Sequence, residues 1–468
     1  MKKKKQVLKA LSISDYAAEG KALGRLDGKV IFVDGAVPGD TANVLITRSK
    51  KDWAEGKALN IVEFSKDRVM PFCKHFGLCG GCKWQMLPYH MQLKYKQQEA
   101  EQNLKRIGKM DLPALMPILG ADKTKYYRNK LEFTFSDKRY LLPQELEQLP
   151  KDYVTEGALG YHVPRIFDKI IDIEECFLMD DINNSIRNNI RRFALENKFT
   201  YYNIKEHTGW LRNIIIRNTT TGQLMLNLIL GYEDMLATNL LMDFILKSFP
   251  QITTLVYTIN KKWNDTIYDL EPIIYFGPGF ITEKLGNYNF KISPKSFFQT
   301  NSRQAESLYT VTKNFACLTG NEIVYDLYCG TGSIGIFCSD GCKKLIGVDV
   351  VEDAIKDAKQ NAVINNISHA SFFSGDVIEI CNNEFFEKHG RPDVIITDPP
   401  RAGMHEKLIN KLIEIKAARI VYVSCNVATQ ARDLSLLADY YDVEKIQPVD
   451  MFPHTHHIEC VASLTLKN

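Results

Sequence analysis

The stretch IVYDLYCGTGS at residues 323–333 joins a short apolar run to a loop that contains two glycines. Runs of this type are typical of buried strands in parallel sheets, and three more follow at residues 344–348, 394–396 and 419–423. Helical stretches separate the runs, for example at residues 353–365. The alternation predicts a doubly wound α/β domain, whose ligand crevice lies beyond the carboxyl ends of its strands.

The loop after the first of these strands has the features of a ligand site. Its glycines allow the backbone to approach a ligand closely. Asp349 ends the next predicted strand, where a carboxylate accepts hydrogen bonds from a ribose diol, and Asp376 closes a third apolar run, where it flanks an adenine. Because the third glycine of the dinucleotide fingerprint is missing, and because Asp326 repels a pyrophosphate but attracts an ammonium group, we expect S-adenosylmethionine. The alternative is an α/β loop with ordinary turn glycines and no nucleotide.

Reactive side chains are predicted to meet at the same crevice edge. Asp398 follows the run 394–397 and Cys425 follows the run 419–423, so both lie at carboxyl ends of parallel strands. Glu459 lies near the start of an alternating strand, which places it beside Cys425 if that strand is antiparallel. The alternatives are a buried free cysteine and an ordinary carboxylate at the start of a strand.

A thiol and a carboxylate at one edge suit the methylation of uracil at C5. Thiolate addition to C6 gives C5 the character of a carbanion, and a general base must later remove the C5 proton. Cys425 is therefore the predicted nucleophile and Glu459 the predicted base. We expect Asp398 and Gln299 to hydrogen-bond the uracil edge or the methyl donor, and Phe298 to stack or to pack.

The amino-terminal residues 7–64 show short strand-like runs separated by glycines, the pattern of a small closed β-barrel similar in size to an OB fold. The net charge of +3 does not by itself indicate a nucleic-acid partner. Arg48, Lys50 and Lys51, however, lie on a predicted hairpin tip, where they attract phosphates or form a solvated loop.

The 468 residues are too many for one ordinary core and predict a multidomain α/β protein. We assign residues 1–65 to the barrel, residues 66–295 to a central α+β domain and residues 296–468 to the Rossmann-like catalytic domain. There is no uncharged apolar run of about 18 residues and no secretory signal, so we expect a cytoplasmic protein without a membrane span.

Eleven cysteines in such a chain are read as thiols, ligands or nucleophiles. A predicted metal-binding set consists of Cys73, Cys79, Cys82 and Cys176. Zinc and an iron-sulfur cluster suit these four thiolates about equally on spacing, and His75 is an alternative ligand. Other cysteines are expected in the core, namely Cys317, Cys338, Cys342, Cys381 and Cys460.

Five sequence blocks resemble the RumA/TrmA family of RNA 5-methyluridine methyltransferases, and the resemblance extends over nearly the whole chain. The blocks are SFFQTN at 296–301, DLYCG at 326–330, DPPR at 398–401, SCN at 424–426 and FPHTHHIE at 452–459. The resemblance implies that Cys425 is the nucleophile and Glu459 the base. It also implies six residues that contact either the methyl donor or the uracil base. They are Gln299, Tyr328, Ser333, Asp349, Asp376 and Asp398. Two departures from the family pattern are Val427, where proline is common, and Ser333, where asparagine is frequent, and neither removes a reactive group.

The resemblance also implies the partner and the second cofactor. The barrel resembles a TRAM domain, which implies contact with RNA, and the cysteine set resembles that of members with a [4Fe-4S] cluster. The barrel and the cluster together resemble members that act on 23S ribosomal RNA, and we expect a monomer. The target uridine must be looped out or flipped into the crevice. Candidate surfaces near the RNA are Arg128, Asn129, Lys130 and the neighbourhood of Trp210 and Arg212, which are equally well explained as structural.

Three other functions remain as alternatives. The first is the same chemistry at the T-loop uridine of tRNA. The second is an RNA-binding or ribosome-assembly protein with a vestigial methyltransferase domain, which the intact Cys425, Glu459 and Asp398 disfavour. The third is an amino-methylating enzyme, which requires no thiol.

Overall fold

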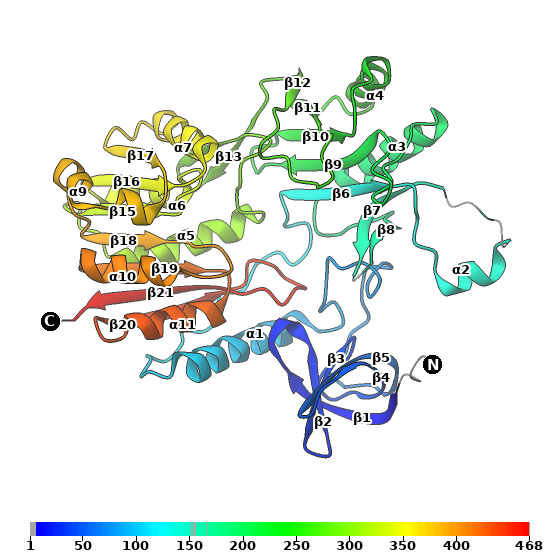
Figure 1. Ribbon diagram of the computed structural model, residues 1–468, viewed down its shortest axis with the longest axis horizontal. Helices are drawn as coiled ribbons and strands as arrows, with labels where there is room; N and C mark the ends of the chain where they lie inside the picture. The colour runs from blue at the N-terminus through cyan, green and yellow to red at the C-terminus, as the bar shows by residue number, and fades with distance from the viewer. Residues whose placement is uncertain (1–5, 151–152, 154–155, 165, 468) are drawn as a thin grey trace.

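The amino-terminal strands form a closed barrel, as predicted. The computed structural model describes residues 6–150, 153, 156–164 and 166–467 (Figure 1). The barrel has the strand order β1-β2-β3-β5-β4. Its elements are β1 (Val7–Tyr16), the turn η1 (Ala18–Gly20), β2 (Ala22–Leu26), β3 (Lys29–Asp34), β4 (Thr41–Ser49) and β5 (Trp53–Glu63). Alternate side chains point inward, and Trp84 and Tyr95, which follow the barrel in sequence, pack into the same core.

The central part of the chain is a mixed seven-stranded sheet with the order β12-β11-β10-β9-β6-β7-β8. Its strands are β6 (Lys130–Ser136), β7 (Ala158–Val163), β8 (Ile166–Asp172), β9 (Leu211–Asn218), β10 (Leu224–Leu230), β11 (Thr254–Ile259) and β12 (Ile273–Phe276). The helices of this part are α2 (Pro143–Gln148), α3 (Ile182–Glu196) and α4 (Met235–Ser248). The apolar sides of α3 and α4 are buried in one core with the sheet.

The carboxyl-terminal part is the predicted α/β domain, with the sheet order β17-β16-β15-β18-β19-β21-β20. Its strands are β15 (Ile323–Leu327), β16 (Lys344–Asp349), β17 (Ala370–Ser374), β18 (Val394–Thr397), β19 (Arg419–Ser424), β20 (Tyr441–Val449) and β21 (Glu459–Leu466). Neighbouring strands from β17 to β19 are parallel, whereas β21 is antiparallel to β19 and β20 to β21.

Helices cover both faces of this sheet (Figure 1). The helical elements are α5 (Ser302–Ala316), α6 (Ser333–Cys338), η3 (Ser339–Gly341), α7 (Glu352–Ile364), α8 (Val377–Ile380), α9 (Asn383–His389), α10 (Glu406–Ile415) and α11 (Val427–Leu437). Val324 packs into the core on one face and its neighbour Tyr325 into the core on the other. This alternation explains why the strands read as continuous apolar runs.

Two segments outside residues 296–468 also pack on the catalytic sheet. The hairpin of β13 (Ile281–Leu285) and β14 (Tyr288–Ile292) shares the core of α5 and α7. The long helix α1 (Tyr89–Asn103), continued by the π-turn η2 (Leu104–Gly108), packs against α11 through Ala100 and Leu104. The division into three domains therefore stays a prediction, because the core of the catalytic part draws on segments that precede it in sequence.

One cysteine prediction was wrong. Cys338, Cys342, Cys381 and Cys460 are buried, as expected, but Cys317 is exposed. Cys317 ends α5 in a left-handed conformation with φ 48°, which removes it from the apolar face of the helix. In the part of the chain that the structure describes, none of the helices has both the length and the apolar character that a bilayer crossing requires.

Candidate active site

Strand register brings the three predicted reactive residues to one edge of the sheet. Ser424, the last residue of β19, pairs with Cys460, so that Cys425 and Glu459 are the next residues on neighbouring strands. Thr397 pairs with Tyr422 on the other side, and Asp398 follows it directly. The expectation that the last strand runs antiparallel is confirmed.

Burial, and in part neighbouring charge, raises the pKa of both carboxyl groups and of the thiol. Glu459 is buried, and burial together with the nearby Asp398 raises its pKa well above the usual range. Burial raises the pKa of Asp398 to about 7. Cys425 is half-buried, and burial, Glu459 and Asp398 raise the pKa of its thiol to about 11. The thiol is therefore protonated at neutral pH, and it needs a proton acceptor when it attacks.

Arg401, to which the sequence assigned no role, lies close enough to two of the three reactive residues to affect their charge states. Its positive charge lowers the pKa values of Cys425 and Glu459 and so opposes the effect of burial. Arg401 Nη2 lies 2.8 Å from His457 Nδ1, and the backbone oxygen of Arg401 accepts a hydrogen bond of 3.1 Å from Asn426. Arg401 lies in the DPPR block and His457 in the FPHTHHIE block. Membership of these blocks was the only feature of the sequence that could have indicated a role for either residue.

This arrangement predicts opposite effects of two substitutions on the reactivity of Cys425. Asp398→Asn removes a negative charge and lowers the thiol pKa, whereas Arg401→Gln removes a positive charge and raises it. At pH 9, below the thiol pKa, a change of one unit alters the thiolate fraction about tenfold. We expect iodoacetamide to alkylate Cys425 up to about tenfold faster in the first variant and up to about tenfold slower in the second. Mass spectrometry of the Cys425 peptide measures the rates.

The exposed Cys317 is an internal reference in the same samples, since its rate should be equal in both variants. Equal rates for Cys425 in both variants would contradict the electrostatic coupling.

The predicted donor loop has an open backbone and, beside it, one buried polar atom without a hydrogen-bond partner among the described residues. Gly330 has φ 52°, and a side chain at this position would point into open space. Asp349 accepts hydrogen bonds from the N–H groups of Gly330 and Val351, both at 2.9 Å. Asp326 is fully buried, and only its Oδ2 accepts a hydrogen bond, from the Gly335 N–H, while Oδ1 has no hydrogen-bond partner among the described residues. An unpaired buried acceptor fits the ammonium group of S-adenosylmethionine.

The remaining predicted donor residues surround the same edge. Tyr328 follows β15 with φ 61°, and Ser333, at the start of α6, lies 2.9 Å from Tyr309 Oη through its hydroxyl. Asp376 is exposed after β17 and caps α8 by accepting from the Ile378 N–H. Gln299 is buried at the entrance to α5, close to the central sheet, since its backbone oxygen accepts from Asn129.

Several candidate RNA contacts have structural roles. Arg212 is buried and donates to the backbone oxygens of Asn260, Lys262 and Asn264. Trp210 is also buried. Phe298 packs in the catalytic core rather than stacking at the surface. Its neighbour Phe297, which the sequence did not single out, is 68% exposed.

The other three candidate RNA contacts, Arg128, Asn129 and Lys130, lie where the central sheet meets the catalytic part of the chain. Arg128 lies over the ring of Phe452, with 5.4 Å to the centroid, and the Asn129 side chain joins the central sheet to Ser302 at 2.8 Å. Lys130 is half-buried, and burial lowers its pKa.

The four predicted metal ligands line one narrow cavity, together with His75 and Tyr161. They are Cys73, Cys79, Cys82 and Cys176. The Gly81 N–H donates to Cys79 Sγ at 3.3 Å, and His75 Nε2 accepts from the Glu174 N–H. Within the described ranges, no group of three or more cysteine, histidine or acidic residues has the arrangement to hold a metal ion.

The parallel sheet, its glycine loop and the acidic residues around that loop define an S-adenosylmethionine-dependent methyltransferase. A family model for tRNA (uracil-5-)-methyltransferases matches residues 274–467, and a TRAM domain model matches residues 9–59. The chain belongs to the RNA uracil-5-methyltransferase family.

Relatives match the chain along its whole length. It is 51% identical to an uncharacterized RNA methyltransferase of Bacteroides thetaiotaomicron, over 96% of this chain and 100% of the relative. A Porphyromonas gingivalis RNA methyltransferase is 47% identical over 97% and 99% of the two chains. The crystal structure of the Pyrococcus abyssi tRNA (uracil-54, C5)-methyltransferase with S-adenosyl-L-homocysteine is similar, with a TM-score of 0.74 and 29% identity, over 98% of this chain and 100% of that chain.

Proposed function

We propose that the protein methylates C5 of a uridine in RNA through a covalent bond between Cys425 and C6 of the base, with Glu459 as the general base. The observation that carries the proposal is the register of β19 and β21, which pairs Ser424 with Cys460. A thiol and a buried carboxyl at one edge suit carbon methylation, because methylation of nitrogen needs no nucleophilic sulfur.

The proposed reaction begins with the loss of the Cys425 Sγ proton to solvent water, so that the Glu459 carboxylate stays free to accept the C5 proton. Sγ then bonds to C6, and the electron pair of the C5–C6 double bond moves toward the C4 carbonyl, which gives C5 the character of a carbanion. When bound, S-adenosylmethionine would supply the methyl group to C5 as an electrophile, with its S–CH3 bond breaking and S-adenosylhomocysteine as the leaving group. The C5 proton passes to the Glu459 carboxylate, the double bond forms again and Sγ is expelled. Arg401 favours the charged forms of both protein groups.

Glu459 suits the second proton transfer because of its surroundings. A carboxylate whose pKa is raised by burial is a stronger base than one in water. We further propose that Asp326, Tyr328, Ser333, Asp349 and Asp376 hold the methyl donor. A second proposed set comprises Gln299 and Asp398, which hold the donor or the uracil edge.

We propose 23S ribosomal RNA as the substrate, supported by the resemblance of the barrel and the cysteine set to ribosomal members of the family. The tRNA T-loop uridine is a second candidate. It is favoured by the similarity to the tRNA (uracil-54, C5)-methyltransferase, which extends over 98% of this chain and so includes the barrel. A cytoplasmic location and a monomeric state stay predictions from the sequence.

Methylation assays on unmodified transcripts decide between the substrates. With labelled S-adenosylmethionine, we expect incorporation into large-subunit ribosomal RNA at least about tenfold faster than into tRNA, a discrimination of about 1.4 kcal/mol. The labelled product should be 5-methyluridine, and substrates tritiated at uracil C5 should release one tritium for each methyl group. Faster incorporation into tRNA would reverse the substrate assignment, and a methylated exocyclic nitrogen would refute the function.

We propose that Cys73, Cys79, Cys82 and Cys176 hold a [4Fe-4S] cluster, with zinc as the alternative. The shared cavity and the N–H donor to Cys79 Sγ support a cluster.

Elemental analysis tests this cofactor. Protein purified without oxygen should contain four iron and four sulfide per chain and absorb visible light. A colourless protein with one zinc would overturn the assignment. Cys73→Ser should lose the iron, whereas Cys317→Ser, at an exposed cysteine outside the cavity, should retain it.

A further inference from the structure

The 450–458 loop connects β20 to β21 and ends at the proposed base. Val449 and Glu459 form the strand pair that closes the loop. His454 within it has φ 64°, a left-handed conformation that is unfavourable for a residue with a side chain. Contacts from outside must therefore hold the loop in this shape, and a change in its shape acts directly on the pair that contains Glu459.

One face of α1 supplies several of these contacts. Lys96 and Asp450 form an ion pair of 2.6 Å, and both side chains are fully buried. Lys96 Nζ also donates to the Phe452 backbone oxygen at 3.2 Å, and the Tyr89 hydroxyl donates to Asp450 at 2.9 Å. Tyr89, Gln92 and Lys96 are three, four and seven residues apart, the spacing of one helical face.

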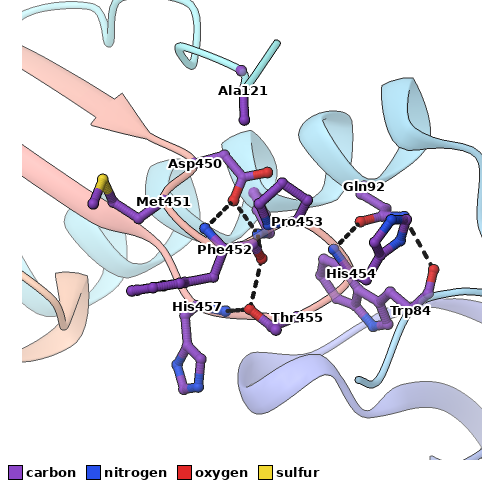
Figure 2. A network of polar contacts seen from close by, with 12 residues as sticks. Trp84, Gln92, Ala121, Asp450, Met451, Phe452, Pro453, His454, Thr455 and His457 are labelled. Atoms are coloured by element: carbon purple, nitrogen blue, oxygen red, sulfur yellow. Dashed lines mark hydrogen bonds and ion pairs between the residues drawn. The ribbon is translucent and has the colours of Figure 1, made fainter. Parts of the chain in front are cut away.

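Gln92, together with Lys83 and Trp84, which follow Cys82 in sequence, holds the backbone of His454. The Gln92 side-chain oxygen accepts from the His454 N–H at 2.8 Å, and its amide nitrogen lies 3.1 Å from His454 Nδ1 (Figure 2). The backbone N–H groups of Lys83 and Trp84 both donate to the His454 oxygen. The side chains of α1 and the backbone of residues 83 and 84 thus hold the middle of the loop from outside the catalytic sheet.

A buried ion pair is a costly way to hold two elements together. Apolar residues of similar volume often stabilise a fold as well as such a pair or better, and the advantage of buried charges is a defined geometry. Lys96 and Asp450 have such a defined geometry, because each side chain has a second hydrogen-bond partner that fixes its direction.

We propose that α1 is a positioning element of the active site, in which Lys96 and Gln92 fix the 450–458 loop and so place the Glu459 carboxyl beside Cys425. This inference rests on the proposed function. Cys425 follows β19, which pairs with β18 and β21 and does not contain the loop. Loosening the loop therefore displaces the base but leaves the nucleophile in place, and it slows the release of the adduct more than its formation.

Lys96→Met tests the proposal, with Lys94→Met as a matched control at an exposed position on the same helix. We expect kcat of Lys96→Met to fall at least tenfold, KM for RNA to stay within twofold, and a covalent protein–RNA adduct to accumulate on denaturing gels during turnover. Lys96→Arg, which keeps the charge, should recover most of kcat. Lys94→Met should behave as the unmodified protein.

If the single variant does not fold, the same measurements are made on the double variant Lys96→Met with Asp450→Leu, which leaves no unpaired buried charge. The proposal is overturned if a folded variant has unchanged kcat, or if it has reduced kcat but forms no adduct. Unfolding of both variants also overturns it, because α1 would then be purely structural. Glu459→Gln is measured in parallel. If it too forms no adduct, the proposed mechanism fails; if it alone traps the adduct, only the role of α1 fails.

Discussion

Replacing Cys425 with alanine is expected to reduce methyl transfer by about 10⁴-fold or more, the order seen when a covalent nucleophile is removed from an enzyme. Without the thiol, C5 of uracil stays too weakly nucleophilic to attack a methyl sulfonium, and no other described thiol lies at the end of β19 or β18. Single-turnover methylation with saturating RNA measures the loss, since it reports the chemical step directly.

The variant should remain folded. Cys425 is half-buried just after β19, and the substitution removes only one sulfur atom, so we expect the free energy of unfolding to change by about 1 kcal/mol or less. Cys317→Ala is the matched control, because it removes an exposed thiol far from the sheet edge in sequence and should retain full activity. Full turnover by Cys425→Ala would refute covalent catalysis.

The catalytic edge could be predicted from the sequence because its signals are local. Each reactive residue follows an apolar run, and the carboxyl ends of parallel strands share one edge by topology. Asp398 and Cys425 therefore required only the identification of two strands. Glu459 required one further assumption, an antiparallel last strand, which the pairing of Ser424 with Cys460 confirms.

The anchoring of the 450–458 loop could not be predicted because its contacts have no local signal. Lys96 and Asp450 are 354 positions apart, and the polar helix α1 reads as a solvated surface helix. The structural role of Arg212 could not be predicted for the same reason, because its hydrogen-bond partners lie about fifty residues further along the chain. The exposure of Cys317 depends on the residue at which α5 ends, which sequence patterns locate poorly.

Glu459→Gln is expected to trap the protein on its RNA. The amide cannot accept the C5 proton, so methyl transfer proceeds but the sulfur is not expelled. The adduct should survive denaturation and migrate as a protein–RNA band on a gel, with one methyl group for each adduct. Turnover should fall by about 10²-fold to 10⁴-fold, the range of general-base catalysis. Glu406→Gln, at an exposed carboxylate in the first turn of α10, should turn over normally and leave no band.

The trapped band also separates the roles of the two carboxyl groups. If Asp398 were the base, Asp398→Asn would trap the adduct and Glu459→Gln would turn over. We expect the reverse, because Glu459 begins the strand that pairs with β19, directly opposite the position of Cys425. The combined variant Cys425→Ala with Glu459→Gln should form no band at all, since the carboxylate acts only after sulfur has bonded to C6. A band in that variant would place the covalent bond on a residue other than Cys425.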